Sequence, residues 1–162
     1  MRINNSRAAS TFAAENKRQP MKRKFRKNLM KSGLVTTIIC VGEREYCFLI
    51  DSGSSQNSVT EEVLKDNEAF SKVVAKTSVY GVDGIPSDYN LIEMQYRCAS
   101  IVSSDQFFVM SSKVFQAIEE ETGIKLRGIL GNPFLFKHKA VIDYSTMELR
   151  IPRGKRVLEA RK

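Results

Sequence analysis

The chain has 162 residues, a formal net charge of +8, one histidine, three cysteines and no tryptophan. This length suits a single domain, and a hydrophobic content of 42% is sufficient for a core, which argues against wholesale disorder. The single histidine, His138, excludes a multi-histidine metal site within one chain. No run of 18 apolar residues is present, so no membrane-spanning helix is predicted.

The three cysteines, Cys40, Cys47 and Cys98, are an odd number without tight spacing. They therefore predict neither a disulfide framework nor a zinc ribbon, and they suit reduced thiols in a cytoplasmic protein. Cys40 and Cys47 fall in apolar runs and are expected to be buried.

The positive charge is concentrated at the two ends. Residues 1–31 have a net charge of +9, residues 32–144 of −5 and residues 145–162 of +4. This pattern predicts a basic, disordered tail over residues 1–32, a folded domain over 33–152 and a basic C-terminal tail over 153–162. The basic run from Lys22 to Lys27 could contact nucleic acid, an anionic membrane or an import receptor. We expect at most a weak nucleic-acid contact through this tail, and no membrane partner.

Between the tails, short apolar and β-branched runs alternate with turn residues, which indicates a series of short strands. Strands are expected at 34–41, 46–50, 71–80, 91–102 and 106–110, with a hairpin at 140–151 and short helices at 58–66 and 113–122. Thr60 is a candidate helix cap, and Gly123 ends the second helix. The fold class predicted is mostly β, a small closed barrel with one or two short helices.

The sharpest local feature is Asp51-Ser52-Gly53, which follows the apolar strand 46–50. The carboxylate should emerge from the core at a tight turn, where Gly53 permits close backbone approach. Apolar surroundings raise the pKa of an aspartate and hydrogen bonds to the anion lower it, so such a site can tune one carboxylate. Alone, this tripeptide is more typical of an ordinary turn than of a catalytic site.

A second feature strengthens this interpretation. Ile129-Leu130-Gly131 lies about 78 residues after Asp51, and the hairpin Ala140–Tyr144 follows it. Together with Asp-Ser-Gly-Ser-Ser and a glycine-bearing turn between them, these elements resemble the retropepsin-like aspartic protease family. The resemblance covers roughly residues 33–152 and implies a small closed β-barrel of the acid-protease type.

The resemblance also implies roles for the aspartate loop. Asp51 would be the catalytic aspartate, Ser52 would tie the two active-site loops together through its hydroxyl, and Gly53 would let the loops approach. Ser54 and Ser55 would support the carboxylate by hydrogen bonds.

Two further segments receive roles from the same resemblance. The residues Ile129, Leu130 and Gly131 would pack beneath the catalytic loop. A flap that closes over a bound peptide would consist of Tyr80, Gly81, Val82, Asp83, Gly84 and Ile85.

An aspartic protease needs two facing carboxylates that share a proton, and this chain has only one Asp-Ser-Gly. Neither Asp83-Gly84 nor Asp143-Tyr144 supplies another. The resemblance therefore implies a symmetric homodimer that hydrolyses a polypeptide substrate, with one Asp51 from each subunit and no metal or cofactor. The alternatives are a catalytically inactive dimerisation or peptide-binding module, and a nucleic-acid-associated protein acting through its tail.

One position departs from the family pattern. After Ile-Leu-Gly, many relatives have a polar pair ending in Asp or Asn, and this chain has Asn132-Pro133. Because proline lacks a backbone donor, contacts usually made by the acidic residue are in question. His138 lies between two lysines and is expected to be exposed and not catalytic.

Overall fold

A computed structural model of the chain describes residues 20–80 and 84–152. The strands are β1 (Met21–Lys24), β2 (Thr36–Val41), β3 (Arg44–Ile50), β4 (Ser58–Thr60), β5 (Ser71–Tyr80), β6 (Pro86–Cys98), β7 (Ile101–Met110), β8 (Leu126–Leu130), β9 (Val141–Asp143) and β10 (Glu148–Ile151). The α-helices are α1 (Arg26–Ser32), α2 (Glu61–Asp66), α3 (Gln116–Thr122) and α4 (Asn132–Lys137). Two 3-10 turns, Glu68–Phe70 and Ser112–Phe115, complete the elements.

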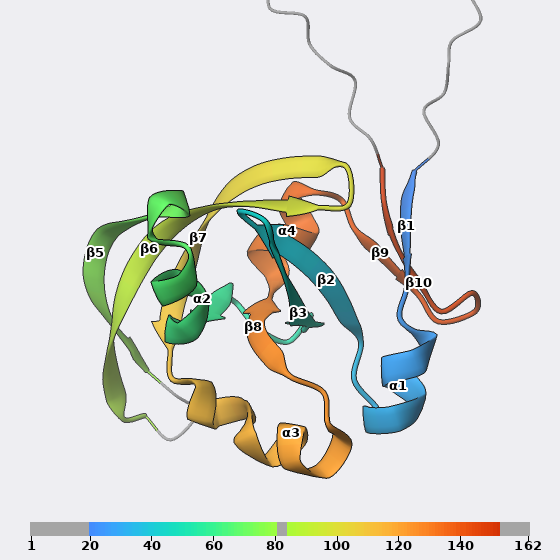
Figure 1. Cartoon of the computed structure of the whole chain (residues 1–162), viewed down its shortest axis with the longest axis horizontal. Coiled ribbons are helices and arrows are strands. Elements are labelled where there is room, and N and C mark those ends of the chain that lie inside the picture. Colours follow the sequence, from blue (N-terminus) through green and yellow to red (C-terminus); the bar gives the residue numbers. More distant parts are fainter. Residues whose placement is uncertain (1–19, 81–83, 153–162) are drawn as a thin grey trace, which may run out of the picture.

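Six strands close into a barrel in the order β2-β3-β8-β4-β7-β6, and a pairing between Cys40 and Arg97 joins β6 back to β2 (Figure 1). The pairs β3–β8 and β4–β7 are parallel, and the other pairs are antiparallel. The long strand β5 pairs only with β6 and extends outside the closed barrel. The prediction of a mostly β, closed barrel with short helices is confirmed.

The barrel interior is filled by alternate residues of its strands. Phe48 and Phe107 are fully buried and meet edge to face, with ring centroids 6.4 Å apart, and Tyr96 packs on Phe107 at 5.7 Å. Gly128 on β8 is required here, because a Cβ atom would lie 2.1 Å from the Phe48 ring and 2.4 Å from the Ser58 carbonyl oxygen. This close packing fixes the end of β3, and hence the start of the loop that follows it.

A small second sheet, in the order β1-β10-β9, lies beside the barrel (Figure 1). It corrects the expected disordered tail over residues 1–32, since residues 21–32 form β1 and α1. Met21 and Phe25 are 4% and 2% exposed, so two apolar residues within the basic run join the core. Antiparallel pairing with β10 satisfies the backbone groups of β1. The rest of that tail, and the predicted tail over 153–162, lie outside the described residues.

Other elements differ from the predictions in detail. The segment expected as a helix over 58–66 divides into β4 and α2, because Val59 is fully buried between β7 and β8. Thr60 occupies the helix-cap position, but its side chain makes no capping hydrogen bond. The strand expected over 91–102 ends at Cys98, where Ala99 has a positive φ of 51° and begins a turn. Within the described ranges, no helix is both long and apolar enough to cross a membrane.

Candidate active site

The aspartate loop begins where β3 leaves the barrel. The Asp51 backbone N–H donates to the Leu130 carbonyl oxygen at 3.1 Å, which continues the β3–β8 pairing by one residue. The loop then turns tightly, since the Ser54 N–H donates to the Asp51 carbonyl oxygen at 3.1 Å. Within the turn, the Gly53 N–H donates to the Asp51 Oδ1 at 2.9 Å. The carboxylate is therefore oriented by the main chain of its own loop, and its side chain remains partly open to solvent.

The segment after β8 passes directly against this loop. The Asn132 N–H donates to the Ser54 carbonyl oxygen at 2.9 Å. A Cβ atom on Gly131 would lie 2.3 Å from the Gln56 carbonyl oxygen and 2.7 Å from that of Ser54. Since both obstacles are backbone atoms, only glycine fits, and Gly131 packs closely against the aspartate loop.

Asn57 joins the two segments and was missed in the sequence. Its side chain is 1% exposed, and its Oδ1 accepts from the Gly131 N–H at 2.9 Å. Its Nδ2 donates to the Gln106 carbonyl oxygen at 3.5 Å, and its own carbonyl oxygen accepts from the Phe108 N–H at 2.9 Å. One buried amide thus joins the aspartate loop, β7 and the turn after β8. Because β4 is Ser58-Val59-Thr60, no apolar run marked Asn57 in the sequence.

The serines of the loop have different surroundings. The Ser54 hydroxyl donates to the Gln56 carbonyl oxygen at 2.8 Å, so it braces the loop and does not bond the carboxylate as predicted. Ser52 and Ser55 are exposed, and within the described residues neither hydroxyl has a hydrogen-bond partner. The tying role of Ser52 and the supporting role of Ser55 remain predictions.

The two apolar residues before Gly131 lie on β8 in register with the end of β3. Ile129 pairs with Leu49, and Leu130, which is fully buried, pairs with Ile50. Pro133 lies in the first turn of α4, where a backbone donor has no partner within the helix. The departure at Pro133 is therefore compatible with the helix that follows the glycine.

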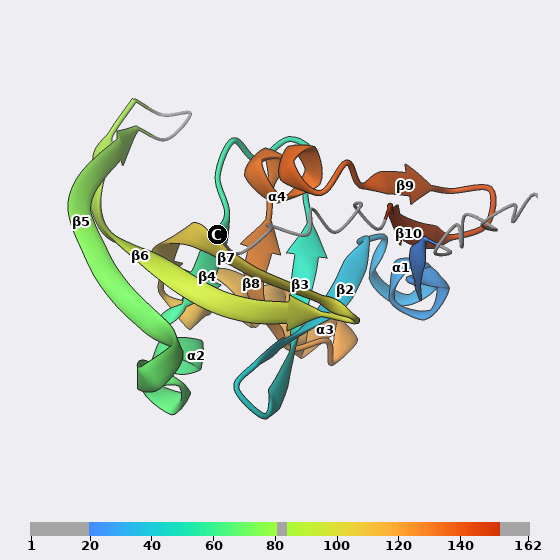
Figure 2. The ribbon, with the colours of Figure 1, turned by 90° about the horizontal axis from the view of Figure 1, so that it is seen from above.

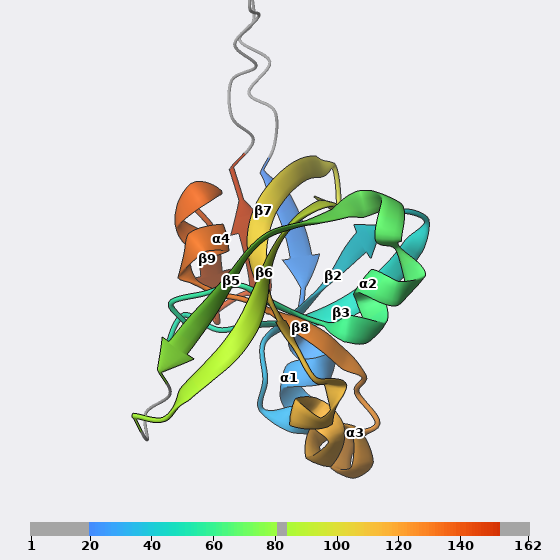
Figure 3. The ribbon, with the colours of Figure 1, turned by 90° about the vertical axis from the view of Figure 1, so that its left-hand side faces the viewer.

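The hairpin β5–β6 contains the predicted flap. Its strands pair up to Tyr80 and Pro86, and its tip lies on the same side of the barrel as the end of β3 and α4 (Figures 2 and 3). Tyr80 is 71% exposed and Ile85 is 62% exposed, and Gly84 has a positive φ of 73°. The remaining predicted flap residues, Gly81, Val82 and Asp83, lie outside the described residues.

His138 is not exposed, in contrast to the prediction. Its side chain is 11% exposed and stacks near Phe134, with ring centroids 4.8 Å apart. Its Nε2 lies 3.8 Å from the Asp105 Oδ2, and the Tyr96 hydroxyl donates to the same carboxylate. Lys137 also contacts Asp105, from Nζ to Oδ1 at 2.5 Å.

This cluster controls the ionisation of its members. Burial alone would raise the pKa of Asp105, but the contacts with His138, Lys137 and Tyr96 outweigh it and hold the pKa at about 2. Burial and the neighbouring Asp105 carboxylate raise the pKa of Tyr96. The cluster joins the end of α4 to the β6–β7 hairpin, and its contacts among the described residues do not include Asp51, so His138 has a structural role.

Asp143 likewise does not supply a second catalytic carboxylate. It caps the β9–β10 turn, where its Oδ1 accepts from the Ser145 N–H at 2.9 Å, and it pairs with Arg150. Hydrogen bonds from Ser145 lower the pKa of Asp143 to about 2. All its contacts are within the hairpin, which indicates a structural role.

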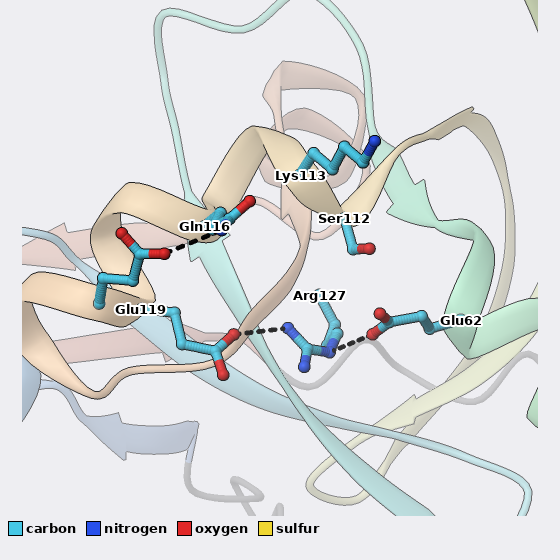
Figure 4. A pocket seen from close by; sticks show the side chains of 7 residues that line it. Glu62, Ser112, Lys113, Gln116, Glu119 and Arg127 are labelled. Atoms are coloured by element: carbon cyan, nitrogen blue, oxygen red, sulfur yellow. Dashed lines mark hydrogen bonds and ion pairs between the residues drawn. The ribbon is translucent and has the colours of Figure 1, made fainter.

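A cavity of about 350 Å³ lies at the start of β8, whereas the aspartate loop contacts the end of that strand. The Arg127 side chain lines this cavity (Figure 4). Its Nε lies 2.9 Å from the Glu62 Oε2, and its Nη1 lies 3.4 Å from the Glu119 Oε2. The guanidinium thus joins α2 to α3 and has its charge paired. No group of three or more metal-ligating His, Cys, Asp or Glu side chains occurs in the part of the chain that the structure describes.

The barrel and the aspartate loop together define a retropepsin-like fold. No protein-family model matches the sequence, and no curated protein matches it. Among solved structures, the chain is similar to the retroviral protease-like domain of Ddi1 from Leishmania major, with a TM-score of 0.50 and 13% sequence identity. The match covers 76% of this chain and 95% of that domain. At this identity the similarity establishes the fold alone.

Proposed function

We propose that the chain is one subunit of a homodimeric aspartic endopeptidase. The observation that carries the proposal is the fixed Asp51 carboxylate, oriented by the Gly53 N–H at 2.9 Å in a loop that packs on Gly131. A retropepsin-like barrel with one such loop has half of the required pair of carboxylates. A second subunit, related by a two-fold axis, supplies the other.

In the proposed reaction, the two Asp51 carboxylates share one proton and titrate as a pair. The ionised carboxylate removes a proton from a water molecule, which attacks the carbonyl carbon of the scissile peptide bond. The protonated carboxyl group donates a hydrogen bond to the carbonyl oxygen, on which negative charge develops. The carboxyl group that took the proton from water then transfers a proton to the leaving nitrogen, and the carbon–nitrogen bond breaks. The pH dependence of the rate should be bell-shaped, since both fully ionised and fully protonated pairs are inactive.

The substrate is an extended polypeptide. The β5–β6 hairpin has exposed apolar side chains at its tip, Tyr80 and Ile85, on the side of the barrel where β3 ends. An extended peptide can form strand-like backbone hydrogen bonds with such a hairpin, and its side chains can contact the apolar residues. We therefore expect a preference for apolar residues near the cleaved bond.

The test is Asp51→Asn in the full chain, assayed on a reduced and alkylated polypeptide. Asp51→Asn should abolish cleavage and leave the sedimentation coefficient unchanged. The matched control is Asp66→Asn, because Asp66 is an exposed aspartate on α2 that pairs with Arg44 at 2.7 Å. This control should cleave at the wild-type rate. Cleavage by Asp51→Asn at the wild-type rate would refute the aspartic mechanism.

Mixing experiments test whether two chains share one site. With free exchange of subunits, a ninefold excess of Asp51→Asn should reduce wild-type activity about tenfold, since nearly all wild-type subunits then lie in mixed dimers. Unchanged activity would contradict a shared site. A wild-type protein that sediments as a dimer and cleaves nothing across the pH range would instead identify an inactive protease-like module.

A further inference from the structure

We propose that the surface formed by β1, α1 and the start of β2 binds the phosphates of a nucleic acid. This site is independent of Asp51 and of the proposed protease activity. It is centred on a cavity of about 360 Å³, to which β1 and α1 contribute three cations. The polar residues that line it are Arg23, Lys24, Lys27, Asn28, Thr36 and Thr37, and no carboxylate is among the lining residues.

Arg23 is the central residue of this cavity. It lies on β1 in alternation with buried Met21, so its side chain turns toward the barrel and is half-buried. Its Nε is removed from solvent and has no hydrogen-bond partner, and within the described residues its guanidinium forms no ion pair. Burying a cation without a partner is costly, and an anion in the cavity would offset that cost.

The cation also acts on a neighbouring thiol. Burial raises the pKa of Cys98, and a contact with Thr37 and the Arg23 charge oppose this rise. Arg23 lines the cavity together with Thr36 and Thr37 of β2, and its Nε is removed from solvent, so the guanidinium lies against the barrel. An arginine in this position can offer a fixed pair of N–H groups to a phosphate.

The other cations of this surface are also largely unpaired. Residues 20–31 contain six Lys and Arg and no acid. Within the described ranges their only ion pair is Lys22 with Glu148, at 3.9 Å. The hydroxyl of Thr36 accepts a hydrogen bond from the Asn28 amide at 2.8 Å, which holds α1 against β2. The cavity is therefore a fixed concave surface with an excess of donors and positive charge.

The distribution of charge favours a long polyanion over a single small anion. Residues 1–19 contain four Lys and Arg with one Glu, and residues 153–162 contain five Lys and Arg with one Glu. These two segments are the sequence neighbours of β1 and β10, which pair with each other through Met21 and Ile151. Residues 32–152 have 11 Lys and Arg against 16 Asp and Glu, and repel a polyanion. A nucleic acid provides the regularly spaced phosphates that such a one-sided surface fits.

The cavity also argues against an anionic membrane as the ligand. A membrane surface is flat and attracts exposed lysines without needing a half-buried guanidinium. Here the least exposed of the three cations that line the cavity, Arg23, also lacks an ion-pair partner, which indicates that individual phosphate groups enter the cavity.

The test measures binding of the full chain to a fluorescein-labelled 20-nucleotide oligouridylate by fluorescence anisotropy, at several salt concentrations. The variant is Arg23→Gln with Lys27→Gln. The matched control is Lys72→Gln with Lys76→Gln, which removes the same charge from two exposed positions on β5. The first pair should weaken binding about tenfold and reduce the slope of log K against log salt by about 1.4, and the control should stay within about twofold of wild type.

Three further measurements test the site: binding by Lys27→Gln, flotation with vesicles, and binding by Asp51→Asn. Lys27→Gln alone changes an exposed residue, cannot disturb the core, and should weaken binding about threefold. Equal losses in the two double variants would show that net charge alone acts, and would overturn the site. Flotation with phosphatidylserine vesicles separates the sources of phosphate: a loss confined to vesicles would overturn the assignment to nucleic acid. Asp51→Asn should bind the oligonucleotide as wild type does, whatever the outcome for protease activity.

Discussion

The buried carboxylate of Asp105 allows a quantitative prediction of pH dependence. Its pKa is about 2 in the folded protein against an ordinary value of 3.8, because contacts with His138, Lys137 and Tyr96 outweigh the effect of burial. A shift of this size corresponds to about 2 kcal/mol of folding stability at neutral pH. Asp105→Asn removes the charge and keeps the shape, so we expect its free energy of unfolding at pH 7 to fall by about that amount.

The sign of the pH effect follows from the direction of the shift. A carboxylate with a lowered pKa contributes fully above its ordinary pKa, and the contribution disappears as the pH falls through the folded value. The wild-type protein should therefore lose this stability between about pH 4 and about pH 2. Over the same interval the difference between wild type and Asp105→Asn should shrink, since the wild-type side chain becomes neutral as well.

Urea denaturation followed by circular dichroism at pH 7, 5, 4 and 3 measures this difference. Asp66→Asn is the control, because Asp66 is largely exposed and its ion pair with Arg44 is accessible to solvent. An exposed ion pair contributes about 0–1 kcal/mol. A difference between wild type and Asp105→Asn that is the same at pH 7 and pH 3 would refute the assignment of the stability to the ionised carboxylate.

Much of the barrel could be predicted from local patterns. The runs at 34–41, 46–50 and 71–80 are apolar or β-branched and end at turn residues, and each contains an observed strand. The aspartate loop could be located for the same reason, since a polar residue directly after a buried strand leaves the core there. The role of Gly131 was implied by the resemblance of Ile129-Leu130-Gly131 and Asp51-Ser52-Gly53 to the retropepsin-like family.

The elements that were missed depend on partners distant in the sequence. Met21 and Phe25 lie in a run dominated by lysine and arginine. Met21 is buried where β1 pairs with β10, and Phe25 is buried where it packs on Tyr144. Asn57 bonds to Gly131, 74 residues away, and His138 lies beside Tyr96, 42 residues away. The charged sequence around Met21 and Phe25, and around His138, indicates exposed segments. Packing against residues distant in the sequence reverses that preference, because burial of apolar surface outweighs the local charge.

Two further predictions concern the junction beneath the aspartate loop. Asn57→Ala leaves the buried Gly131 N–H without an acceptor and should cost about 2 kcal/mol in urea denaturation. Gly131→Ala places a Cβ atom 2.3 Å from the Gln56 carbonyl oxygen and 2.7 Å from that of Ser54, so the loop must move, at a cost of about 1–3 kcal/mol. Gly33→Ala is the control, because Gly33 has a φ of 72° and no atom within 4 Å, so it tests backbone strain of about 1 kcal/mol without a collision. Gly131 has a φ of −95°, which any residue can adopt, so backbone strain cannot explain a loss there. An unchanged free energy of unfolding in Gly131→Ala would contradict the close contact.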